Sequence, residues 1–288
     1  MLTDTHAHLD YPDFSADLDD VIARAAQEGV TRIITIGTGL ESSRRAVALA
    51  EKYPSIYAVV GVHPTNVLEE PGDFLPALRE LARHPKVAAI GETGLDYHHL
   101  PSEISAQTSP ALSALQAGVS EDIEASVMDG AYRDAQGEAF RMQLDLAVEL
   151  GLNVVIHQRD AWDDTVGILK NYTGKVRGVF HCFGNLPEQA AEIITLGHLV
   201  SFTGIVTFKN AALVHETVAV IPADAFMVET DCPYLAPAPY RGQRCEPWHT
   251  KLVAEKVAEL RGQSLEEIAV QTTLTAEKFF RLGAGKSQ

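Results

Sequence analysis

The stretch KVAAIGE, residues 86–92, is a short apolar run that ends in a carboxylate. Seven further strand candidates occur along the chain: LTDTH from residue 2, TRIITIG from 31, IYAVVGV from 56, NVVIH from 153, RGVFH from 177, HLVSFTG from 198 and FMVETD from 226. Most of these runs show little polar alternation, which is typical of strands buried on both faces of a parallel sheet. Eight strands alternating with helices in 288 residues predict a single-domain TIM-type (β/α)8 barrel over residues 1–288, in preference to a doubly wound open sheet.

The segments between these strands have apolar residues at helical spacing. Residues 18–26 and 74–82 each place such residues at i, i+3, i+4 and i+7. Gly29 and Gly151 follow periodic segments, where helices commonly end, and Pro187 stands where a helix commonly begins. The helices are therefore expected to lie against the sheet along one apolar stripe each.

Residues 101–131 interrupt this alternation after the fourth strand. They are rich in Pro, Ser, Ala and Gly, and they contain five acidic residues but no Lys, Arg or aromatic residue. We expect an insertion at the barrel rim, on the catalytic face, with short helices near residues 111–116 and 122–128. Two roles stay open for it: a lid that shapes the substrate site, or a tolerated surface insertion.

The charge of the chain limits its partners. Lys and Arg number 23 against 39 Asp and Glu, a net charge of −16, which disfavours binding to nucleic acid or anionic membranes by a general electrostatic field. An acidic protein can still act on a phosphodiester when bound cations assist. The absence of an 18-residue apolar run and of a signal-like start predicts a cytoplasmic chain with no membrane partner. The three cysteines contain no C-x-x-C pair, so reduced thiols are expected.

Side chains that bind metals follow most of the predicted strands. In a β/α barrel these strand ends converge on one mouth, the catalytic face. Four imidazoles and two carboxylates are expected to meet there and to hold two divalent ions with a bridging carboxylate. Such mixed ligation suits Zn, Mn or Mg without choosing among them. The expected ligands are His6, His8, Glu92, His157, His181 and Asp231.

Two ions of this kind predict hydrolysis. They lower the pKa of a bound water towards neutrality, align it with an electrophilic phosphorus or carbon, and neutralise charge on the leaving oxygen. Asp231 is the candidate acceptor of the water proton. The alternative is that these residues are capping or core polar groups. This alternative could explain a single histidine but not all six residues together, because buried unpaired polar groups are costly.

Six segments resemble the signatures of one family. They are THAHLD at 5, GVHP at 61, GETGLD at 91, VIHQRDA at 155, HCF at 181 and ETDCPYL at 229. Their order and spacing resemble the TatD-type metal-dependent deoxyribonucleases, a branch of the amidohydrolase-like barrels. The resemblance implies a TIM-type barrel with two or three divalent ions, held by the six residues above, with Glu92 spanning the metals.

The resemblance also implies roles around the metals. His63 is expected to contact a phosphate or to take part in catalysis, and Arg159 to steady a substrate phosphate. Asp96 and Glu229 are expected to orient imidazoles or waters. The long segment after GLD and the Cys232 in ETDCPYL depart from the family pattern, although a nucleophilic role for that thiol is not expected.

Four more side chains near these motifs have open roles. Arg241 and Arg244 follow the eighth strand. Their guanidinium groups could each contact a substrate phosphate through two hydrogen bonds, or they could be solvated charges on the surface. His98 and His99, beside the insertion, are expected to be exposed loop residues rather than ligands.

Three classes of function compete. The first is a deoxyribonuclease acting on single-stranded DNA or on strand ends, without a stable protein partner. The second is an amidohydrolase acting on an amide, a lactone or another ester, including the ester of aminoacyl-tRNA. Many such enzymes carry a carboxylated lysine at the fourth strand, whereas this chain has Glu92, which favours the first class. The third is a non-catalytic binding barrel, which the complete ligand set disfavours.

Overall fold

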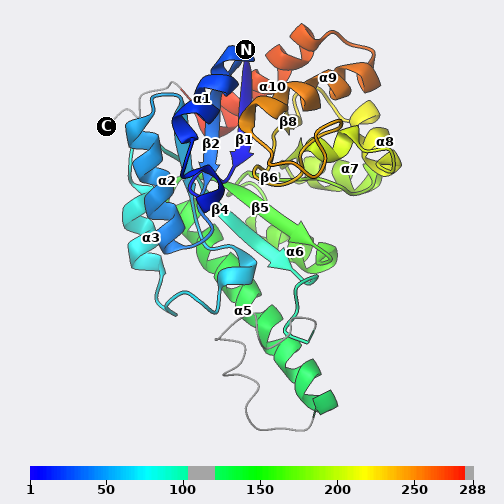
Figure 1. Cartoon of the computed structure of the whole chain (residues 1–288). Helices are drawn as coiled ribbons and strands as arrows, with labels where there is room; N and C mark the ends of the chain where they lie inside the picture. The colour runs from blue at the N-terminus through cyan, green and yellow to red at the C-terminus, as the bar shows by residue number, and fades with distance from the viewer. Residues whose placement is uncertain (103–120, 283–288) are drawn as a thin grey trace.

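The fold is a β/α barrel with eight strands in the part of the chain that the computed structural model describes, residues 1–102 and 121–282 (Figure 1). All neighbouring strands are parallel and follow one another in sequence order. The strands are β1 Leu2–Ala7, β2 Val30–Ile36, β3 Ile56–Val60, β4 Val87–Asp96, β5 Asn153–Arg159, β6 Gly178–Phe180, β7 Leu199–Phe202 and β8 Phe226–Val228. The predicted barrel and its eight strands are confirmed.

Helices surround the strands on the outside of the barrel (Figure 1). They are α1 Leu18–Gln27, α2 Leu40–Lys52, α3 Leu75–Ala82, α5 Glu121–Leu150, α6 Trp162–Leu169, α7 Pro187–Thr195, α8 Ala212–Val220, α9 Thr250–Arg261 and α10 Leu265–Phe280. Short 3-10 turns cover Pro12–Phe14, Pro64–Asn66, Lys170–Tyr172, Gly204–Thr207 and Pro247–His249. As predicted, Pro187 begins a helix, and Gly29 and Gly151 follow helices with positive φ.

The barrel closes between its first and last strands, at their carboxyl ends. Ala7 and Cys232 form a parallel bridge, and the His8 N–H donates to the Cys232 carbonyl at 2.8 Å. The Asp231 N–H donates to the His6 carbonyl at 2.9 Å. Closure therefore sets Asp231 beside the two histidines of the first strand.

One expectation about the insertion is wrong. Residues 122–128 are not a separate short helix, because they belong to the 30-residue helix α5, whose first turns project away from the barrel (Figure 1). The apolar spacing of residues 121–130 does not distinguish a short helix from the first turns of a long one. The helix expected near residues 111–116 lies outside the described residues. The predicted insertion follows the fourth strand in sequence and lies between β4 and α5.

Candidate metal centre

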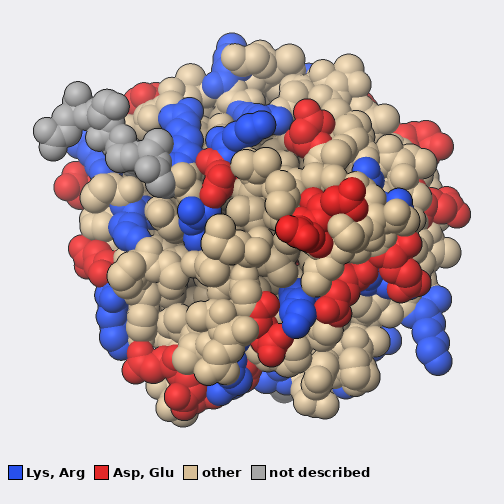
Figure 2. All heavy atoms as spheres, turned by 90° about the horizontal axis from the view of Figure 1, so that it is seen from above, with Lys and Arg blue, Asp and Glu red and all other residues tan. Residues whose placement is uncertain are grey.

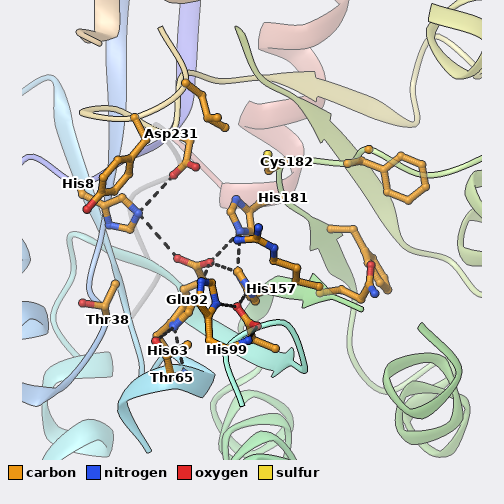
Figure 3. Close-up of a pocket in the computed structure, with 18 of the residues that line it drawn as sticks. His8, Thr38, His63, Thr65, Glu92, His99, His157, His181, Cys182 and Asp231 are labelled. Carbon is orange, nitrogen blue, oxygen red and sulfur yellow. Dashed lines mark hydrogen bonds and ion pairs between the residues drawn. The ribbon is translucent and has the colours of Figure 1, made fainter. Parts of the chain in front are cut away.

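The six predicted ligands meet at the carboxyl ends of the strands, where five of them line a cavity of about 850 Å³ and the sixth, His6, is fully buried beside them. Figure 3 shows the Glu92 carboxylate in the middle, with His8 and Asp231 on one side and His157 and His181 on the other. Glu92 lies within β4 and is 2 % exposed. A carboxylate at the centre of several imidazoles has the placement that a bridging ligand requires.

One group of donors comes from β1 and the loop after β8. His8 Nε2 lies 3.4 Å from Asp231 Oδ1, and His6 Nε2 lies 3.6 Å from the same oxygen. The two Nε2 atoms lie 3.3 Å apart. Asp231 has a positive φ of 61°, an uncommon conformation for a non-glycine residue. The backbone thus adopts a strained conformation where it directs this carboxylate towards the cavity.

The second group comes from β4, β5 and the end of β6. Glu92 Oε1 lies 2.8 Å from His157 Nδ1 and 2.7 Å from His181 Nε2. These two ring nitrogens lie 3.1 Å apart. Both groups bring nitrogen and carboxylate donors close together, which is an arrangement that fits a divalent cation. The described residues form three sets of donors that could each hold an ion: His6, His8 and Asp231; His6, Glu92 and His181; and His63, Glu92 and His157.

Close packing of β4 against β5 brings Glu92 and His157 together. Gly94 has a φ of 147°, and a Cβ atom there would collide with the carbonyl oxygen of His157. Only glycine allows this approach and this conformation together. The GETG segment thereby places β4 at the distance from β5 that the site requires.

Burial and neighbouring charges shift the pKa values at the site in opposite directions. Burial alone would raise the pKa of Glu92, but the imidazoles of His181, His63 and His6 outweigh it and hold this pKa well below its usual range. Burial would lower the pKa of His157, yet the carboxylates of Asp96 and Glu92 raise it to about 9. The Glu92 carboxylate is therefore ionised, which is the form that a cation would bind.

His63 lies at the edge of the second group. Its Nε2 is 3.5 Å from Glu92 Oε1, and its Nδ1 accepts the backbone N–H of Thr65 at 3.2 Å. Burial and the neighbouring His157 lower its pKa to about 4. His63 is therefore neutral at neutral pH, with its proton assigned to the Nε2 that faces the cavity.

Asp96 and Glu229 lie behind the imidazoles. Asp96 Oδ2 is 3.2 Å from His157 Nε2 and 2.9 Å from His99 Nδ1. Glu229 Oε1 accepts the Cys182 N–H at 2.7 Å and lies 3.8 Å from His181 Nδ1, beyond hydrogen-bond distance. His99 is nearly half exposed, as expected of a loop residue, but it also lines the cavity.

The three predicted arginine contacts fall in different places. Arg159 is exposed and lines the cavity, whereas Arg241 and Arg244 are not among the described residues that line it. Arg241 lies over the Phe208 ring at 4.0 Å. Arg244 donates to Asp17 and Glu246 at 2.7 and 2.8 Å. A phosphate role for these arginines stays a prediction.

Two buried glutamines behind the site have no counterpart in the sequence analysis. Gln143 of α5 accepts the Val62 N–H at 2.8 Å and donates to the Val62 carbonyl at 3.0 Å. Gln136, two turns earlier, pairs with the Asp96 N–H and carbonyl at 2.9 and 3.0 Å. Each side-chain amide bonds both the N–H and the carbonyl of one residue, as the backbone of a neighbouring strand does. Together the two glutamines fix the backbone next to His63 and at Asp96.

A parallel barrel with imidazoles and carboxylates at the carboxyl ends of its strands defines the class of metal-dependent hydrolases. Residues 3–281 match the family described as "TatD related DNase". The chain belongs to this TatD family of metal-dependent hydrolases.

Relatives and solved structures of the family resemble the whole chain. The chain is 41% identical to the uncharacterized metal-dependent hydrolase YabD of Bacillus subtilis, over 98% of this chain and all of that one. It is 32% identical to a protein of Erwinia tasmaniensis named "3'-5' ssDNA/RNA exonuclease TatD", over 97% and 99% of the two chains. The crystal structure of YJJV, a TatD homolog of Escherichia coli, superposes with a TM-score of 0.81 at 30% identity, covering 98% of each chain.

None of the helices in residues 1–102 and 121–282 combines the length and the hydropathy that a membrane span requires.

Proposed function

We propose that this chain is a divalent-metal-dependent deoxyribonuclease that hydrolyses phosphodiester bonds in single-stranded DNA or at strand ends. The observation that carries the proposal is the Glu92 carboxylate, placed between two groups of metal-binding side chains. The family and the exonuclease name of one relative support a nucleic-acid substrate. Phosphate-rich substrates also need cations here, because the net charge is −16 and acidic and basic side chains are interspersed on the face shown in Figure 2.

In this proposal two divalent ions, Mg, Mn or Zn, are held by His6, His8, Glu92, His157, His181 and Asp231. When bound, they activate a water molecule and stabilise negative charge on the phosphate oxygens.

The chain's own residues supply the proton transfers and the substrate contacts. Asp231 lines the cavity and lies 3.4 Å from His8 Nε2, so its carboxylate accepts the proton of the attacking water. His63 donates a hydrogen bond from Nε2 to a phosphate oxygen, since Nδ1 is occupied by Thr65. Arg159 pairs with a phosphate at the mouth of the cavity.

The test is hydrolysis of a 5′-labelled single strand with Mg²⁺ or Mn²⁺ after removal of bound metal. We expect metal-dependent cleavage by the wild type and a loss of at least 100-fold in kcat/KM in His157→Ala and Asp231→Asn. Glu216→Gln, an exposed carboxylate on α8, is the matched control and keeps full activity. Unchanged cleavage in His157→Ala contradicts the proposal. Turnover of lactones or aminoacyl esters far above that of DNA favours the amidohydrolase alternative.

A further inference from the structure

One aromatic side chain at the mouth of the cavity is exposed. Tyr234 lines the cavity with 55 % of its surface exposed, and it is the only aromatic residue among the large exposed apolar side chains of the described chain. Burying a large apolar side chain contributes roughly 1.5–3 kcal/mol, and a ligand that packs on this ring inside the cavity would gain part of that free energy.

Tyr234 lies on the Asp231 side of the metal centre. Its N–H donates to the Asp231 carbonyl at 3.0 Å, and the preceding Pro233 carbonyl accepts the Cys245 N–H at 2.9 Å. These two bonds fix the backbone that presents the ring. A ring on a fixed loop loses little conformational freedom when a ligand packs against it.

A neighbouring ring connects Tyr234 to the metal ligands. Tyr11 stacks on His8 with ring centroids 4.7 Å apart and an angle of 20°. Tyr234 meets Tyr11 almost perpendicularly, at 79° and 6.3 Å. One face of the Tyr11 ring is therefore covered by His8, whereas the Tyr234 ring does not continue that stack. No described residue forms a hydrogen bond with the Tyr234 hydroxyl group.

We propose that the Tyr234 ring is a stacking platform for the nucleobase next to the scissile phosphate. The inference rests on the proposed nuclease function and specifies the part of the substrate that the cavity recognises. A ring stacks on any base, because every base has a π face, so this contact favours nucleic acid over smaller esters without reading its sequence. Arg159, at the same mouth, contacts the charged backbone, and Tyr234 contacts the base.

The experiment compares Tyr234→Ala and Tyr234→Phe with the wild type on single-stranded tetranucleotides. Each strand is used intact and with one nucleoside replaced by an abasic residue, at each position in turn. KM and kcat are measured with Mn²⁺. The Kd is measured separately by fluorescence anisotropy with phosphorothioate strands, which are cleaved slowly. Leu213→Ala, an apolar side chain of α8 that is 49 % exposed and lies away from the cavity lining, is the matched control.

We expect Tyr234→Ala to raise KM and Kd about ten-fold on intact strands while kcat changes less than two-fold, and Tyr234→Phe and Leu213→Ala to behave as the wild type. Removing the base at one position should raise KM and Kd of the wild type by the same ten-fold factor and should leave KM and Kd of Tyr234→Ala unchanged. Equal KM and Kd in Tyr234→Ala and the wild type, or an equal loss on every abasic strand, overturns the inference. If the wild type binds strands without cleaving them, the proposed nuclease function fails, and the Kd comparison still decides the stacking role.

Discussion

Asp96 Oδ2 lies 3.2 Å from Nε2 of His157, on the side of the ring away from Glu92. The same imidazole is therefore held at both nitrogens, by one carboxylate facing the cavity and one behind it. Such outer carboxylates fix the orientation of a metal-binding imidazole and increase its basicity.

Replacing Asp96 by Asn is expected to weaken metal binding without unfolding the barrel. Loss of an outer carboxylate commonly lowers metal affinity 10- to 100-fold, and we expect about this factor for Mn²⁺ by isothermal titration calorimetry. Asp224→Asn, at an exposed loop carboxylate before β8, is the control. Equal affinities in all three proteins would show that Asp96 does not support the ligand.

Replacing Glu92 by Gln is expected to change the number of bound ions. Glu92 belongs to two of the three possible donor groups, whereas the group of His6, His8 and Asp231 does not need it. The wild type should retain two ions per chain after dialysis, and Glu92→Gln at most one, by elemental analysis. Glu216→Gln should retain both. Two ions in Glu92→Gln with unchanged affinity would contradict a bridging role.

Gln143→Met tests the connection between α5 and the site. Methionine has a similar length but leaves the buried Val62 N–H and carbonyl without their partners. Each unpaired buried polar group costs about 1–3 kcal/mol, so the loss of both partners should lower the free energy of unfolding in urea by about 2–6 kcal/mol. The exposed Val148→Met on the same helix controls for the new side chain. Stability equal to that of the wild type would refute the role of these two hydrogen bonds.

His198 makes stability depend on pH. It is 1 % exposed, its Nδ1 accepts the Gly178 N–H at 2.9 Å, and burial lowers its pKa to about 4. The His198 side chain takes up a proton near pH 6.5 in the unfolded chain but only near pH 4 in the folded chain. The free energy of unfolding is therefore highest above pH 6.5 and decreases as the pH falls from 6.5 towards 4.

Between pH 7 and pH 5 this difference removes about 1–2 kcal/mol from the free energy of unfolding. His198→Asn keeps an acceptor for Gly178 but does not titrate, so its stability should depend less on pH over this range in urea titrations. His98→Asn, at a side chain that is 47 % exposed, should follow the wild type. An unchanged slope in His198→Asn would show that another group is responsible.

Arg244→Ala separates the two roles considered for this residue. Its guanidinium joins Asp17, before α1, to Glu246, before α9, and Arg24 binds the same two carboxylates. The pKa of Asp17 is lowered to about 2, first by its hydrogen bond to Arg244. We expect the melting temperature to fall by about 2–4 °C with KM for DNA unchanged. A raised KM at constant melting temperature would instead support phosphate contact.

Much of the site could be predicted because parallel strands buried on both faces leave a simple pattern. A carboxylate or imidazole that ends an apolar run, as Glu92 and His157 do, stands out against the strand before it, and the barrel topology brings such ends together. The partner of Arg244 could not be predicted in this way, because Asp17 lies on another element far away in sequence and nothing in either segment identifies the pair.

The glutamines of α5 were missed for a related reason. Gln136 and Gln143 look like ordinary polar positions of a helix, and only the packing of α5 on β4 shows that both are buried. Tyr234 was missed as well, because tyrosine occurs both buried and exposed in proteins and nothing in ETDCPYL indicates that its ring is exposed at the cavity.

The bridge between Ala7 and Cys232 has a consequence for the order of biosynthesis. His6 and His8 leave the ribosome first, but Asp231 follows more than 220 residues later. No shorter nascent chain contains the complete donor set, so full metal loading must wait until the eighth strand has emerged and joined the first. Chains that end before β8 therefore lack Asp231, the proposed acceptor of the water proton, whatever secondary structure they form.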